Sequence, residues 1–253
     1  MNRWSVPFLL ILLLLLAIPP VQAEKKPEKI NVLVFSKTAG VRHNSISNGI
    51  KMMSELAQKE NWVLTCTENS NLFTSGFLSQ MDVVVFLNPS ADVFDEQQQK
   101  AFEKYIRSGK GFVGIHAATT CEYDWLWFGG LVGAYFSTHP PAQEGTVIIE
   151  DINHPAMEPF EKMDTYITFD EWYSFKENPR GKVQVLASLD EKSIKITKND
   201  DWKMGDHPLI WSHEYEGSRS FYTVFGHTPE AFDDENVRRH IAGAINWAAR
   251  RVD

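Results

Sequence analysis

Two short runs of mostly apolar residues set the strongest limit on how this chain can fold. One is Ile30–Phe35 and the other is residues 82–87, and each has too few polar positions for one face to meet water. Strands buried on both faces are typical of parallel sheets, because helices cover both sides of such sheets. The sequence therefore predicts an α/β fold built on an open, mostly parallel sheet.

Helices alternate with strands in the first half of the chain. Apolar residues recur with helical spacing over residues 46–57, and a second helix is predicted between Asp95, close to a capping box, and Gly109. Further strands are expected at Trp62–Thr67 and residues 111–116. With right-handed crossovers, this order predicts a flavodoxin-like strand order of 2-1-3-4 in a three-layer sandwich.

The second half is less regular but is interpreted as part of the same domain. Further strands and a final helix are expected at residues 146–150, 183–189, 209–212, 220–225 and 236–251. The segment 155–180 is rich in aromatic residues, acids and prolines, and is interpreted as an excursion over the end of the sheet. Residues 30–253 are therefore predicted to form a single domain, which is a plausible size for one α/β unit.

The first 23 residues have the pattern of a secretory signal peptide. Arg3 precedes an apolar run, Pro19 and Pro20 break it, and Ala23 is a small residue suited to cleavage. A spanning helix needs about 20 apolar residues, so this run is too short for an anchor. We expect residues 1–23 to be removed and residues 24–29 to form a linker. The mature protein should be periplasmic or secreted, with no membrane anchor.

The net charge argues against nucleic-acid binding, and the placement of the two cysteines argues against a disulfide. The formal net charge is −8 at pH 7, whereas a protein that binds nucleic acid presents a basic surface. Cys66 and Cys121 belong to predicted strands three spacings apart, which is about 14 Å and too far for a disulfide. We expect both thiols to be free and Cys66 to be buried.

Histidines follow several predicted strands at the edge where open α/β sheets bind ligands. His43 lies in the loop after the first strand, His116 closes the fourth, and His227 follows the strand at residues 220–225. A single histidine at a strand end is more often structural than catalytic, but three at one edge favour a functional cluster. His139 comes from a glycine-rich segment that the pattern does not place.

The other histidines have structural interpretations. His207 and His213 flank a short strand, about 20 Å apart at about 3.3 Å per residue, so they cannot share one metal ion. His240 lies on the last predicted helix and is expected at the surface.

Asp170, Glu171, Trp172 and Tyr173 form a second candidate site. Carboxylates can accept hydrogen bonds from sugar hydroxyls, and an aromatic face can stack on the apolar face of a pyranose. The same residues could instead form a solvated acidic turn anchored by a core tryptophan, which composition alone favours.

Short motifs along the chain together resemble the ThuA-like (trehalose utilisation) family. They run in order from about residue 30 to residue 247, almost all of the chain after residue 23. They are Arg42-His43, the run GKGFVGIHAA at residues 109–118, Gly133-Ala134-Tyr135-Phe136 with His139-Pro140, His154-Pro155, Asp170-Glu171-Trp172-Tyr173, His207-Pro208-Leu209-Ile210-Trp211 and Gly226-His227-Thr228. The resemblance implies a class I glutamine amidotransferase-like fold, in agreement with the predicted strand order.

The resemblance also implies that the usual chemistry of that fold is lost. Amidotransferases place a nucleophilic cysteine on a sharp strand-to-helix turn, and His116 stands at the corresponding position here. His227 and Glu230 look like the other two members of the amidotransferase triad. Without the thiol, acyl transfer by that route is not available.

Family context implies a role in disaccharide or glucoside catabolism, often linked to oxidation of the sugar at C3. A 3-keto sugar has an acidified C2 proton, and its removal by a base would let elimination or hydration cleave the glycosidic bond. The resemblance assigns proton transfer to His116, His227 and Glu171. A divalent metal ion held by histidines, or the Arg42 guanidinium, could stabilise the oxyanion.

The expected partner is therefore a small-molecule carbohydrate. The residues expected to bind it are Arg42, His43, His139, Asp170, Trp172, Tyr173 and Glu230. Two alternatives stay open at this stage. One is a non-catalytic carbohydrate-binding domain of the same fold, and the other is a metal-dependent hydrolase of another ester or amide.

Secretion of the full chain should yield a mature protein that begins at or near Glu24, because signal peptidase cleaves after small residues such as Ala23. N-terminal sequencing of protein from the extracytoplasmic fraction measures the cleavage site. Recovery of membrane-bound protein that retains Met1 would contradict this prediction.

Overall fold

A nine-stranded mixed sheet lies at the centre of the part of the chain that the structure describes. The structure is a computed structural model and describes residue 1 and residues 29–253, so the predicted signal peptide, apart from Met1, and most of the linker lie outside the described residues. The strands of the sheet are β1 (Ile30–Phe35), β2 (Trp62–Thr67), β3 (Val83–Leu87), β4 (Gly111–Ile115), β6 (Gln143–Ile149), β7 (Thr165–Asp170), β9 (Gln184–Leu189), β10 (Pro208–Tyr215) and β11 (Ser218–Thr223).

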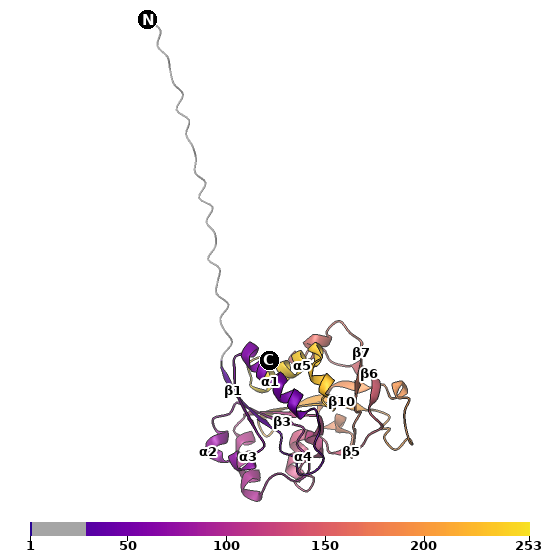
Figure 1. Cartoon of the computed structure of the whole chain (residues 1–253), viewed down its shortest axis with the longest axis horizontal. Helices are drawn as coiled ribbons and strands as arrows, with labels where there is room; N and C mark the ends of the chain where they lie inside the picture. Colours follow the sequence, from indigo (N-terminus) through magenta and orange to yellow (C-terminus); the bar gives the residue numbers. More distant parts are fainter. Residues whose placement is uncertain (2–28) are drawn as a thin grey trace.

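Five parallel strands, in the order β2-β1-β3-β4-β11, form one half of the sheet. This confirms the predicted order 2-1-3-4 and the α/β fold class. The α-helices are α1 (Ile46–Glu60), α2 (Ser75–Leu78), α3 (Glu96–Arg107), α4 (Leu126–Val132) and α5 (Glu235–Ala248). Figure 1 shows α1 and α5 on one face of the sheet and α2, α3 and α4 on the other, which makes three layers. None of the helices in the described residues has an apolar stretch long enough to cross a bilayer.

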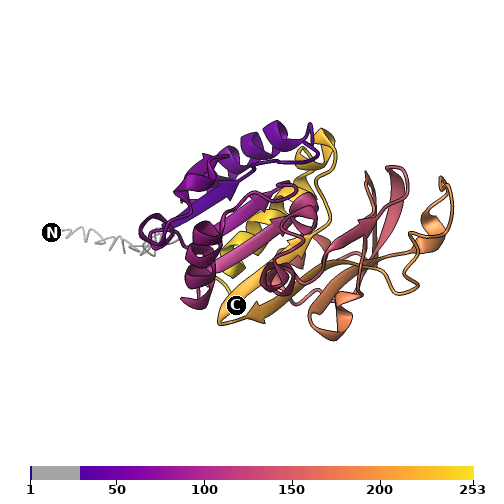
Figure 2. The same cartoon turned by 90° about the horizontal axis from the view of Figure 1, so that it is seen from below.

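The other half of the sheet is antiparallel and consists of β10, β9, β6 and β7. It extends away from the helix-covered half, as Figure 2 shows. Two short strands, β5 (Phe136–Thr138) and β8 (Ser174–Phe175), pair separately beside it. The interpretation of residues 155–180 as an excursion is therefore wrong in part, because β7 within that segment is one of the two edge strands of the main sheet. The residues of β7 alternate between exposed and buried positions, so β7 lacks the continuous apolar run that identified the central strands.

Local signals position the helices as expected. Asp95 accepts hydrogen bonds from the N–H groups of Gln97 and Gln98, and the Gln98 side chain accepts from the Asp95 N–H, which completes the capping box of α3. Gly111 allows α5 to approach β4, because a Cβ there would lie 2.5 Å from the Ala248 carbonyl oxygen.

Two expectations about single side chains are wrong. Cys66 is exposed rather than buried, because it lies on β2 at the edge of the sheet. Both Cys66 and Cys121 are free, as predicted. His240 is fully buried rather than at the surface, because it lies on the face of α5 that packs on Phe160, Phe221 and Phe225.

A buried histidine pair links α5 to the 3-10 helix Pro155–Phe160. His240 Nδ1 donates to the Ala156 carbonyl oxygen at 2.8 Å, and His154 Nδ1 accepts from the Ala156 N–H at 3.1 Å. Burial lowers the pKa of each imidazole from 6.5 to about 4. For His154 the neighbouring His240 and Arg219 lower the pKa further, and Asp151 raises it.

The histidine pair should make the fold acid-sensitive. Both folded pKa values lie below the unfolded value, so the unfolded chain binds more protons as pH falls from 6.5 towards 4, and stability is lost over that window. Replacing His240 by Gln removes one such group. Between about pH 7 and about pH 5 the variant should lose roughly 2 kcal/mol less unfolding free energy than the wild type.

Urea unfolding of both proteins at the two pH values measures this difference, because the carboxylates contribute equally to both and cancel. Equal acid dependence of the two proteins would contradict the prediction.

Candidate functional site

Strand β4 ends in a sharp turn that places His116 at the carboxyl edge of the sheet. His116 has a φ of +46°, which few non-glycine residues adopt, and it begins the 3-10 helix His116–Thr120. Tyr222 Oη donates to the His116 carbonyl oxygen at 2.9 Å, and the Ala117 N–H donates to Asn88 Oδ1 at 3.2 Å. The neighbouring strands therefore hold the turn in its strained conformation.

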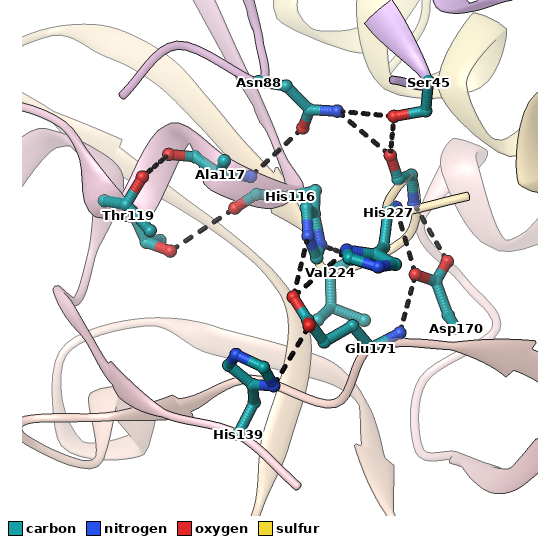
Figure 3. A network of polar contacts seen from close by, with 12 residues as sticks. Ser45, Asn88, His116, Ala117, Thr119, His139, Asp170, Glu171, Val224 and His227 are labelled. Carbon is teal, nitrogen blue, oxygen red and sulfur yellow. Dashed lines mark hydrogen bonds and ion pairs between the residues drawn. The ribbon is translucent and has the colours of Figure 1, made fainter. Parts of the chain in front are cut away.

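The buried amide of Asn88 joins this turn to two other segments. Its Nδ2 donates to Ser45 Oγ at 3.1 Å and to the Gly226 carbonyl oxygen at 3.0 Å. Ser45 precedes α1, and Gly226 lies in the loop after β11, so four parts of the sheet edge meet here (Figure 3). Asn88 is not among the predicted site residues, although an asparagine directly after a fully buried strand is a usable signal.

The His116 ring is fully buried and has a fixed orientation. Its Nδ1 lies 2.7 Å from the carbonyl oxygen of Val224, which can only accept, so we assign the proton to Nδ1. Tyr173 packs on the ring with centroids 4.2 Å apart. The remaining nitrogen, Nε2, then carries a lone pair. It lies 3.6 Å from Glu171 Oε2 and has no hydrogen-bond partner.

The buried carboxylate of Asp170 brings the end of β7 to the same place. Its oxygens accept hydrogen bonds from the N–H groups of Gly226 at 2.9 Å, His227 at 3.0 Å and Glu171 at 2.8 Å. Three backbone donors therefore fix Asp170, and through it the positions of Glu171 and His227.

Glu171 lies at the centre of the histidines. Its Oε2 is 3.1 Å from His227 Nδ1, and its Oε1 is 3.0 Å from His139 Nδ1, as Figure 3 shows. Burial alone would raise the pKa of Glu171, but the contacts with His116 and His227 hold it well below its usual range. The contact with Glu171 raises the pKa of His227 in turn. The carboxylate is thus the negative charge that the imidazoles share.

His43 completes the cluster from the loop after β1. Its ring contacts those of His116 and His227, with centroids 4.9 and 5.2 Å away. Burial first, and then the proximity of His116 and His227, lowers the pKa of His43 to about 3, so the ring is neutral at physiological pH. His43, His116, Glu171 and His227 each offer one ligand atom, and these atoms lie within 4.8 Å of one another.

The structure thus brings together five of the expected site residues, His43, His116, His139, Glu171 and His227. The donors are those that bind a transition metal, and the same groups can also exchange protons with a ligand. Asp170 and Tyr173 support the cluster from behind: Asp170 is 1% exposed and Tyr173 is 3% exposed.

Three expected ligand-binding residues lie elsewhere. Trp172 is fully buried and donates its Nε1–H to the Gln143 carbonyl oxygen at 3.0 Å, so it cannot stack on a sugar. Arg42 points to Glu68 in an exposed ion pair of 2.7 Å. Glu230 is exposed, and the carboxylate beside His227 belongs to Glu171. The triad assignment of Glu230 is therefore wrong, because the acid comes from a different strand of the sheet.

A separate cavity of about 540 Å³ lies between α4 and the end of β10. Its lining includes Tyr123, Tyr135, Lys176 and His213, and contains none of the residues of the cluster. We place the chemistry at the cluster rather than in this cavity, because several buried or half-buried ionisable side chains contact one another there at the carboxyl ends of strands.

Fold and site together define the class of protein. It is an α/β protein of the class I glutamine amidotransferase-like fold, with His116 on the turn after β4. The sequence matches the ThuA family, described as trehalose utilisation, over residues 31–248, and the chain belongs to that family. Among functionally curated proteins, no sequence matches this chain.

Solved structures support the fold assignment. A ThuA-like protein from Bacteroides uniformis has a TM-score of 0.74 and 24% identity, over 90% of this chain and 94% of that one. A ThuA-like protein from Parabacteroides merdae has a TM-score of 0.68 and 19% identity, over 88% and 90%. The glutaminase domain of CTPS from Trypanosoma brucei has a TM-score of 0.51 and 9% identity, over 85% and 93%. At these identities the similarity concerns the fold alone.

The backbone strain at His116 should affect the free energy of unfolding of variants at this position. His116→Gly and His116→Ala both remove the imidazole, but at a φ of +46° only glycine is free of strain. The glycine variant should therefore be more stable than the alanine variant by about 1 kcal/mol. Chemical denaturation of the two variants measures the difference.

Lys100, exposed in the middle of α3, offers a matched control. There Lys100→Ala should be more stable than Lys100→Gly by about 1 kcal/mol, the ordinary helix preference. The same order at both positions would contradict a strained turn at residue 116.

Proposed function

We propose that the chain is an enzyme of disaccharide or glucoside catabolism and that the histidine–glutamate cluster is its active site. The observation that carries the proposal is the position of His116, which lies on the turn after β4 and has an unpartnered Nε2. The resemblance to amidotransferases implies that their reacting side chain occupies the corresponding turn. His43, His227 and Glu171 surround that atom. Membership of a family described as trehalose utilisation supports the substrate class.

The reaction we propose is the cleavage of a 3-keto-glycoside. A base removes the proton from C2, which the adjacent C3 carbonyl acidifies, and the electron pair forms a C1–C2 double bond as the C1–oxygen bond breaks. The leaving oxygen takes a proton from an acid, so the products are an unsaturated keto sugar and an alcohol. Water can then add to the double bond, which completes a net hydrolysis. No oxidant is consumed in this step.

The cluster supplies the groups that such a reaction needs. An imidazole that exchanges a proton near neutral pH serves as base or acid, and His116 and His227 are available for these roles. Positive charge near the C3 oxygen would stabilise the enolate, and a metal ion held by the cluster would supply it. The missing cysteine nucleophile argues against acyl transfer.

Substitution of His116 by Asn should lower turnover of a 3-keto-glucoside by about 100-fold or more, because Asn cannot carry a proton. Glu171→Gln should do the same, since it removes the charge that holds the histidines. Glu96→Gln, an exposed carboxylate on α3, is the matched control and should keep wild-type turnover. Steady-state assays with keto-glucosides and with the parent disaccharides measure the effect.

Wild-type turnover by the His116→Asn variant would rule out this site. If the wild type binds these sugars but converts none of them, the non-catalytic carbohydrate-binding alternative is supported and the proposed reaction is wrong.

A further inference from the structure

We propose that His43, His116, His227 and Glu171 bind one divalent transition-metal ion. The inference deepens the proposed function and rests on it only for the place of the reaction. The four side chains come from four separate segments of the chain, at the ends of β1, β4, β7 and β11. No local sequence motif holds them together, so their convergence depends on the tertiary fold.

Three buried nitrogen atoms of the cluster make no hydrogen bond of good geometry: His43 Nδ1, His116 Nε2 and His227 Nδ1. His227 Nδ1 has the Glu171 carboxylate 3.1 Å away, whereas His43 Nδ1 and His116 Nε2 have no hydrogen-bond partner. Buried polar atoms in folded proteins are nearly always hydrogen-bonded, so two unpartnered nitrogens beside a carboxylate call for a ligand. Each is a nitrogen that can carry a lone pair, which is the donor that a metal ion requires.

The distances fit a metal centre. Ligands bonded to zinc at about 2.0–2.1 Å in a tetrahedral site lie about 3.4 Å from one another. Glu171 Oε2 is 3.6 Å from His116 Nε2 and 3.1 Å from His227 Nδ1. The largest separation in the set, at most 4.8 Å, needs only a small side-chain movement to close on an ion.

The residues behind the cluster are also those expected around a metal. Ligating histidines usually donate their other N–H to a carbonyl or carboxylate, which fixes the ring and its tautomer. His116 does so through Nδ1 to the Val224 carbonyl oxygen. His139 contacts Oε1 of Glu171, the carboxylate oxygen that is not among the proposed metal ligands. Asp170 holds the backbone of Glu171 and His227.

The donor set selects the kind of ion. Three imidazole nitrogens and one carboxylate oxygen favour zinc, iron, cobalt, nickel or manganese, whereas magnesium and calcium prefer oxygen ligands.

Metal titration without substrate tests the inference. Purified protein without a polyhistidine tag is treated with a chelator, checked for folding by circular dichroism, and titrated with Co²⁺ and Zn²⁺. We expect about one ion per chain, visible Co²⁺ bands typical of nitrogen ligands, displacement by Zn²⁺ and none by excess Mg²⁺. Folded protein that takes up neither ion would overturn the inference.

Variants locate the bound ion. His43→Asn and His227→Asn should each weaken Zn²⁺ binding by about 100-fold or more, and His139→Asn by about 10-fold, as for a residue that positions a ligand. Glu96→Gln should bind like the wild type. Unchanged affinity in both ligand variants, with folding intact, would place the ion elsewhere and refute the site.

The outcomes separate the metal site from the proposed reaction. Intact metal binding with no turnover of any keto-glycoside contradicts the reaction and supports the metal site. Turnover that persists at the wild-type rate in metal-free protein supports the reaction and contradicts the metal site.

Discussion

The buried Asp170 carboxylate is the contact on which the arrangement of the site depends. It ends β7, the edge strand farthest from β2, yet it accepts the N–H groups of Gly226 and His227 in the loop after β11. Burial raises the pKa of Asp170, and the backbone donors counter this effect by favouring the charged form. One carboxylate therefore ties the end of β7 to the loop after β11 and brings Glu171 into the cluster.

Short-range patterns were enough to predict the parallel half of the fold. The continuous apolar runs of β1 and β3, an amphipathic helix after each of these two strands, and the capping box at Asp95 are local signals, and together they lead to the order 2-1-3-4. The same reasoning placed His43, His116 and His227 at one edge, because carboxyl ends of parallel strands meet there. The prediction that these three histidines lie close together therefore rests on the sheet topology and not on a sequence motif.

The acidic member of the site could not be assigned in this way. Glu171 reaches the histidines because β7 pairs with β6 and the chain then turns back towards β11, and neither pairing leaves a local mark. Residues that are adjacent in the sequence also differ in whether their side chains face the core or the site. Trp172 faces the core while Glu171 faces the cluster, and the sequence pattern does not say which side chain faces which way. His240 was misplaced for the same reason, since its helix is buried over a wider face than its apolar residues indicate.

A histidine at the turn changes what its neighbours must provide. A thiol nucleophile needs one base, and that base needs one acid. The Nδ1 of His116 is instead hydrogen-bonded to the Val224 carbonyl oxygen, and its Nε2 presents a single lone pair. His43 Nδ1 nearby also lacks a hydrogen-bond partner. Each such buried atom costs roughly 1–3 kcal/mol. A proton relay through His227 and Glu171 would leave His43 without a role, whereas the proposed metal centre would use all four groups and would offset this cost.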